Sequence, residues 1–226
     1  MDEVRGVGEA GVRGRPGLRE QPGLRERKKL RTYQAVSDVA VALFLERGFD
    51  AVSVAEVAAA AEISKPTLFR YFPAKEDLVL HRFADHEDEA ARVVAGRGAG
   101  ESPLDALHRH FLAGLDRRDP VTGLNDHPAV LAYLRLLYGT PALVARMQGY
   151  LERSEAALAR ALADGADPGL AARLAAGQIV AVQRVLAHEN WRRIADGATA
   201  SDVRDDAVAA ADLAFGQLRD GLQNKT

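Results

Sequence analysis

The chain has 226 residues, of which 47% are hydrophobic and 27% charged, and its formal net charge at pH 7 is -2. This composition predicts a folded protein with a sizeable core and excludes wholesale disorder. Cysteine is absent, which excludes disulfide frameworks, cysteine-ligated metal sites and thiol catalysis, and favours a reducing compartment such as the cytoplasm.

The beginning of the chain differs in composition from the rest. Residues 1–30 mix Gly, Pro and Arg with few large apolar side chains, a composition that cannot form a packed core. From Arg13 to Arg31 there are eight basic residues and two acidic ones, a local excess that suits phosphate groups. We predict a disordered basic arm over residues 1–30. The alternative is a wrongly assigned start codon that adds residues without a role.

Helical periodicity begins at Thr32, where apolar residues recur at offsets of three and four, and it ends at Gly48, a typical helix C-cap. A short second helix is predicted after Ser53, because Ser53 and Glu56 have the spacing of a capping box. Two short helices joined by a tight turn form a helix-turn-helix, which places its second helix in the major groove of DNA.

The helix that would enter the major groove is the third in the chain. It begins after Ser64, which can cap it, and Pro66 fits its first turn. Pro73 ends it. A fourth helix is predicted from about Lys75 to Val94.

Polar caps followed by proline mark the later helices. No segment alternates with the period of a strand, so we predict an all-α protein with about nine helices. The later ones are predicted at about 103–117, 128–138, 141–163, 168–195 and 201–222.

The run from Phe44 to Leu78, FLERGFDAVSVAEVAAAAEISKPTLFRYFPAKEDL, resembles the TetR family of bacterial transcriptional regulators. The most specific part is KPTLFRYF followed by KEDL. The resemblance covers about Thr32 to Leu80. It implies a three-helix DNA-binding domain over residues 31–80 and a helical-bundle domain over residues 81–226 for effector binding and dimerisation.

The resemblance also implies which residues contact DNA. Lysine can donate to guanine, and threonine can bond a base or touch a thymine methyl, so Lys65 and Thr67 suit base edges. Hydroxyl and ammonium groups suit phosphate. Phe69, Tyr71 and Phe72 could instead be core aromatics, which is the preferred interpretation for Phe72 and the less favoured one for Tyr71. Arg70 could be a solvated charge. The expected DNA-binding residues are Lys28, Arg31, Ser53, Ser64, Lys65, Pro66, Thr67, Phe69, Arg70, Tyr71 and Lys75.

One position departs from the family pattern. The family usually has Gly in the turn before the third helix, whereas this chain has Glu62. A left-handed backbone at this position would cost about 1 kcal/mol. We expect the turn to persist.

The last two predicted helices, 168–195 and 201–222, carry more apolar and small residues than a surface helix needs, which predicts a homodimer interface. The alternative is that both helices close a monomeric core. A helical bundle also offers a pocket for a small effector. The candidate lining residues are Phe111, Tyr133, Tyr138, Met147 and Trp191, with His110 and Arg135 as polar anchors; each could instead be ordinary core.

The sequence contains no phosphate-binding loop, nucleophile elbow or metal-ligand spacing, so no enzyme activity, cofactor or metal is expected. It has no charge-free apolar run of the ~18 to 20 residues that a membrane span needs. We therefore predict a cytoplasmic, homodimeric repressor that a small effector releases from a palindromic DNA operator. The alternatives are an architectural DNA-binding protein without an effector and a helical protein that only binds a small molecule.

Overall fold

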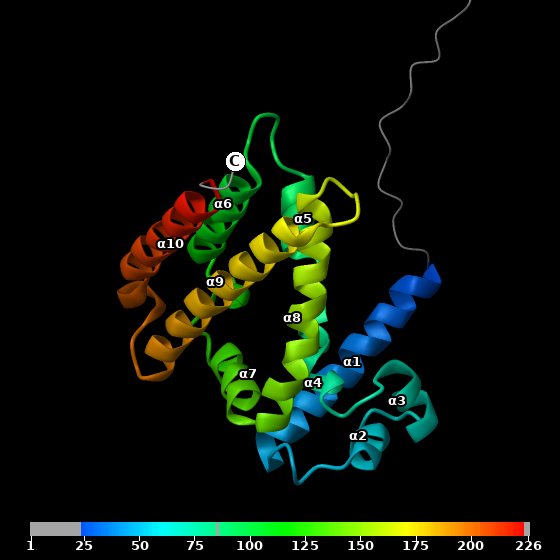
Figure 1. Ribbon diagram of the computed structural model, residues 1–226. Helices are drawn as coiled ribbons and strands as arrows, with labels where there is room; N and C mark the ends of the chain where they lie inside the picture. Colours follow the sequence, from blue (N-terminus) through cyan, green and yellow to red (C-terminus); the bar gives the residue numbers. More distant parts are fainter. Residues whose placement is uncertain (1–23, 85, 224–226) are drawn as a thin grey trace, which may run out of the picture.

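The structure, a computed structural model, describes residues 24–84 and 86–223, and every regular element within these ranges is a helix. The predicted all-α fold is confirmed (Figure 1). The elements are α1 Leu24–Arg47, α2 Val54–Ala60, α3 Lys65–Tyr71, α4 Asp77–Ala84, α5 Glu89–Ala95, α6 Pro103–Asp116, the 3-10 helix η1 Pro120–Thr122, α7 Pro128–Gly139, α8 Pro141–Leu162, α9 Leu170–Ala195 and α10 Ala200–Gln223.

Two predicted boundaries are wrong. Helix α1 begins at Leu24, so residues 24–30 are helical rather than part of a disordered arm; residues 1–23 lie outside the described part of the chain. The predicted fourth helix is two helices, α4 and α5, separated by turns over residues 86–88. Because Glu89, at the start of α5, interacts with both His86 in the turn and His110 on α6, tertiary contacts hold this break.

Helices α1 to α4 lie beside α7 and the start of α8 (Figure 1). One cluster of buried apolar side chains joins all of these helices. Phe44 on α1 and Leu68 on α3 lie at its centre and are almost fully buried. Tyr133 and Leu137 on α7 and Met147 on α8 belong to the same cluster. The first four helices therefore share their core with helices from the second half of the chain.

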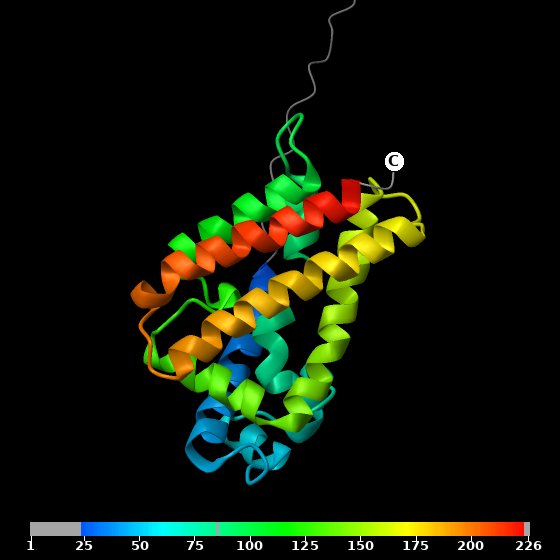
Figure 2. The same ribbon diagram turned by 60° about the vertical axis from the view of Figure 1, so that its left-hand side comes forward.

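A second apolar cluster joins α5, α6, α8, α9 and α10. Helix α8 runs from the first four helices to α5 and so takes part in both clusters (Figure 1). Helices α9 and α10 lie side by side along one side of the molecule (Figure 2).

Gly123, after η1, is required where the chain passes α9. Its φ is +73°, and a Cβ at this position would lie 1.8 Å from the carbonyl oxygen of Ala187. The buried Asn190 donates from Nδ2 to the carbonyl of Thr122 at 2.9 Å. These contacts hold η1 against α9.

Candidate nucleic-acid interface and effector cavity

Helices α2 and α3 form the predicted helix-turn-helix, and both begin at the predicted caps. Ser53 Oγ accepts from the amide of Glu56, and Glu56 accepts from the amide of Ser53, which completes the capping box. The hydrogen bond from the Ser53 amide, together with the Arg47 guanidinium, lowers the pKa of Glu56 to about 2. Ser64 Oγ accepts from the amide of Thr67 at 3.2 Å.

The turn between these helices is a Schellman motif. The amide of Glu62 donates to Ala59 O at 3.1 Å, and the amide of Ile63 donates to Ala58 O at 3.0 Å. This motif needs a left-handed residue after the C-cap, and Glu62 has a φ of +53°. The expectation that the turn persists without Gly is therefore confirmed.

Helix α3 has one buried side and one exposed side. Leu68 and Phe72 are buried, which confirms Phe72 as a core aromatic. Lys65, Pro66 and Arg70 are exposed, and Phe69 is 41% exposed. A short helix with an exposed lysine and proline in its first turn has the shape and charge that enter a major groove.

Three other predicted contact residues are less available. Thr67 Oγ1 lies 2.8 Å from Ser64 Oγ, and the two hydroxyls form a hydrogen bond. The ring of Tyr71 is partly buried against Tyr33, with their centroids 4.8 Å apart. Lys75 Nζ donates to the carbonyl of Phe49 and lies 4.3 Å from the Phe49 ring centroid, so its ammonium faces the protein.

Helix α1 extends toward the basic start of the chain. Arg31, in this helix, is exposed. Lys28 belongs to the same helix, but its side chain lies outside the part that the structure describes. The phosphate-binding prediction for Lys28 therefore concerns a helix rather than a loose arm.

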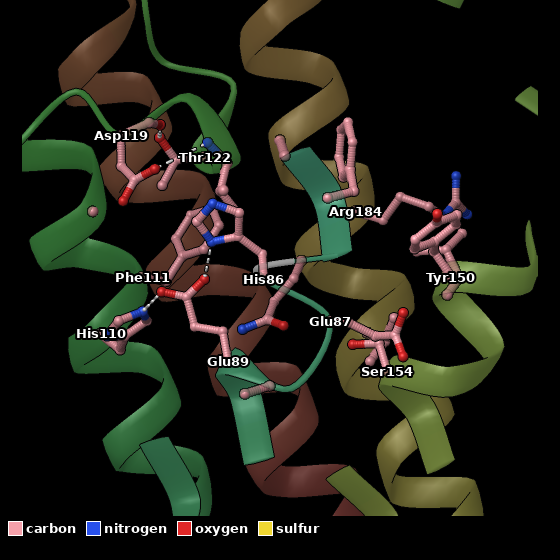
Figure 3. A pocket seen from close by; sticks show the side chains of 18 of the residues that line it. His86, Glu87, Glu89, His110, Phe111, Asp119, Thr122, Tyr150, Ser154 and Arg184 are labelled. Carbon is pink, nitrogen blue, oxygen red and sulfur yellow. Dashed lines mark hydrogen bonds and ion pairs between the residues drawn. The ribbon is translucent and has the colours of Figure 1, made fainter. Parts of the chain in front are cut away.

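A cavity of about 180 Å³ is lined by residues of α4, α5, α6, η1, α7, α8 and α9 and of the turn between α4 and α5 (Figure 3). Four aromatic side chains line it: Phe83, Phe111, Tyr138 and Tyr150. Cavities of this size, about 150 Å³, admit a benzene ring.

One wall of the cavity carries a carboxylate held by two imidazoles. His86 Nδ1 lies 2.7 Å from Glu89 Oε2, and His110 Nε2 lies 3.0 Å from Glu89 Oε1 (Figure 3). The hydrogen bond to His110, followed by the one to His86, holds the pKa of Glu89 well below its usual range. Glu89 therefore stays anionic and already has partners.

The cavity contains part of the predicted effector site. Phe111, Tyr138, Met147 and the predicted anchor His110 line it, whereas Tyr133, Trp191 and Arg135 are not among its lining residues. Tyr133 instead donates to the carbonyl of Val79 at 2.8 Å. Trp191 packs on Tyr138 with 4.5 Å between ring centroids, and Arg135 reaches the carbonyl of Ala195. Sequence periodicity identifies these side chains as inward-facing but not which cluster each joins.

Gln183 and Arg184 on α9 also line the cavity, and neither residue was predicted to lie there. The available signal was a polar pair between two short apolar runs of α9, residues 179–182 and 185–187. Equally unforeseen was the pairing of Arg146 on α8 with the buried Asp77, the first residue of α4. Arg146 Nε and Nη2 lie 2.9 Å and 3.0 Å from the two Asp77 oxygens. Asp77 Oδ2 also accepts from the amide of Ala74, in the segment after α3.

Four large apolar side chains of α9 and α10 are exposed. Leu170 on α9 and Leu213 on α10 are 68% and 65% exposed, and Leu174 and Val185 are exposed as well. Helix α9 is long and apolar enough to cross a membrane, and only 22% of its most apolar window is buried. Length and composition of one such helix are weak grounds for a span, because core helices of other proteins have the same properties.

The fold and the exposed face of α3 define a helix-turn-helix DNA-binding protein with a helical second domain. The family described as bacterial regulatory proteins, tetR family, matches residues 37–81. The chain is 34% identical to the HTH-type transcriptional regulator TcmR of Streptomyces glaucescens over 198 residues, which cover 85% of this chain and 83% of TcmR. The chain belongs to the TetR family and is a transcriptional regulator.

Other similarities are more limited. The transcriptional regulator MftR of Mycobacterium tuberculosis, named for mycofactocin biosynthesis, is 42% identical over 78 residues, or 34% of this chain and 39% of MftR. Among solved structures, NalD of Pseudomonas aeruginosa, the secondary repressor of the MexAB-OprM multidrug efflux pump, has a TM-score of 0.54 at 17% identity. The similarity covers 82% of this chain and 97% of NalD. At that identity the similarity concerns the fold alone.

Proposed function

We propose that this regulator is a homodimeric repressor, acting in the cytoplasm, that binds a palindromic operator and is released by a small effector in the cavity. The observation that carries the DNA-binding part is the exposed side of α3, led by Lys65 and Pro66, opposite the buried Leu68. In a two-fold dimer, two such helices would read successive major grooves, about 34 to 36 Å apart.

For base contacts we propose Lys65, Pro66, Thr67 and Phe69, and for phosphate contacts Ser53, Ser64, Arg70, Tyr71, Arg31 and Lys28. Lys75 is left out of this interface, because its ammonium would have to leave the carbonyl of Phe49 to reach a phosphate. Thr67 would exchange its bond to Ser64 for one to DNA.

The proposed dimer forms through α9 and α10, whose exposed leucines and valine have no cover among the described residues. A second copy of the same side would bury them around a two-fold axis. The cavity favours this regulator over an architectural DNA-binding protein, because a protein without an effector needs no space in its core.

Fluorescence anisotropy with labelled DNA from upstream of the protein's own gene tests the DNA-binding part, at several salt concentrations. We expect Lys65→Ala to weaken operator binding by about 10-fold and to reduce the preference over random duplex, since one base contact discriminates by roughly 1 to 3 kcal/mol. Arg160→Ala is the matched control, because Arg160 is an exposed cation near the end of α8. The proposed interface is wrong if both variants bind like the wild type.

A further inference from the structure

The charged side chains around the cavity differ in whether they already have an ion-pair or hydrogen-bond partner within the protein. Glu87 is paired with Arg153 at 2.9 Å, and Glu89 with His86 and His110. The third carboxylate, Asp119, accepts from the amide of Val121 at 3.1 Å and lies 3.7 Å from Arg117. Each acidic side chain on the lining therefore already has a partner within the protein.

Arg184 is the exception: its side chain is exposed to solvent and forms no ion pair with a described residue. It lines the cavity from α9, across the pocket from His110 (Figure 3). The neighbouring Gln183 also lines the cavity and has no hydrogen bond to any described group. The guanidinium and the amide are both donors, so this side of the cavity offers hydrogen bonds to an acceptor.

Tyr138 adds a third donor. It lines the cavity, lies close enough to Arg184 to sense its charge, and has no hydrogen bond to a described group. Burial raises the pKa of Tyr138, so its hydroxyl keeps its proton and can donate. The apolar remainder of the lining includes Phe83 and Phe111, which suit a flat ring.

From this distribution we infer that the cavity binds a small aromatic acid, with its ring among Phe83, Phe111 and Met147 and its carboxylate on Arg184. The volume of about 180 Å³ limits the body of the ligand to about one ring. This inference rests on the proposed function, in which the cavity is the effector site. A cationic ligand is disfavoured, because the acidic side chains would have to give up their present partners.

Three probes of nearly the same shape test the charge: benzoate, the neutral benzamide and the cationic benzamidine. Isothermal titration calorimetry on the full chain is expected to give benzoate an affinity about 10-fold above benzamide, since hydrogen bonds to a charged group are the stronger ones. Arg184→Gln is expected to abolish this preference and to leave benzamide unchanged. Arg160→Gln, the control cation on α8, should keep it.

Several results would overturn the inference: no binding by any probe, a preference for benzamidine, or benzoate binding that Arg184→Gln leaves intact. Light scattering on Arg184→Gln guards against another role, because loss of the dimer would assign Arg184 to the subunit interface. Operator anisotropy with benzoate separates the two proposals. Selective benzoate binding without any change in operator affinity would support the ligand class and contradict the effector role.

Discussion

Glu62 holds a backbone conformation that costs an L-residue free energy, and it does so in the turn that orients the proposed recognition helix. The Schellman bonds to Ala58 and Ala59 fix that conformation. A residue whose position is fixed by backbone bonds on both sides keeps its turn even when its own side chain is unsuited to it.

Glu62→Gly is therefore expected to stabilise the protein by about 1 kcal/mol, since glycine adopts the left-handed region without a Cβ penalty. Thermal and urea unfolding would measure the change. Glu62→Ala is the control, because it removes the charge and retains the Cβ, and we expect no comparable gain from it. If the two variants are equally stabilised, the effect is electrostatic and the backbone argument is wrong.

At the scale of single elements, α9 and α10 carry large apolar side chains where a surface helix carries polar ones. Leu170, Leu174 and Val185 follow one side of α9, and Leu213 lies on α10. Exposed apolar residues of this kind are typical of protein interfaces, which supports the proposed dimer.

Leu213→Glu is expected to raise the dimer dissociation constant by more than about 100-fold, because a two-fold interface loses the leucine from both copies, at about 1.5 to 3 kcal/mol each. Size-exclusion chromatography with light scattering would detect the monomer. Val144→Glu is the matched control, since Val144 is an exposed apolar residue on α8. A dimeric Leu213→Glu protein would exclude α10 from the interface.

Helix α8 links the cavity with the first four helices of the molecule. Its residues Met147, Tyr150 and Ser154 line the cavity, while the adjacent Arg146 holds Asp77 beside the segment that follows the recognition helix. A movement of α8 when the cavity is filled would therefore displace α4 as well. Coupling between sites needs a physical element of this kind, with different contacts in the two states.

A filled cavity can be imitated by mutation. Ser154→Phe is expected to weaken operator binding in the wild-type background. The loss of affinity caused by Ser154→Phe is expected to be about 5-fold smaller when Arg146→Gln is also present, because coupled neighbours deviate from additivity by roughly 0.5 to 3 kcal/mol. Anisotropy on the four proteins of this cycle gives the coupling. Arg160→Gln replaces Arg146→Gln in the control cycle and should give none. Strict additivity in both cycles would rule out the Arg146–Asp77 pair as the connection.

Several local features could be predicted from the order of the amino acids alone: the capping box at Ser53, the cap at Ser64, the burial of Phe72 and the left-handed turn at Glu62. Each depends on residues within a few positions of one another, so the local pattern contains the necessary information. The composition of α9 and α10 also predicts a dimer interface, and this interface stays a prediction.

The contacts between distant segments could not be predicted in this way and are known from the folded chain. The tertiary structure divided the predicted fourth helix at the His86–Glu89–His110 cluster, turned Lys75 toward Phe49, and assigned Tyr133 to a bond with Val79 instead of the cavity. Periodicity states which side of a helix faces inward, but not which neighbour it meets. The neighbour depends on packing and hydrogen bonds between residues far apart in the chain.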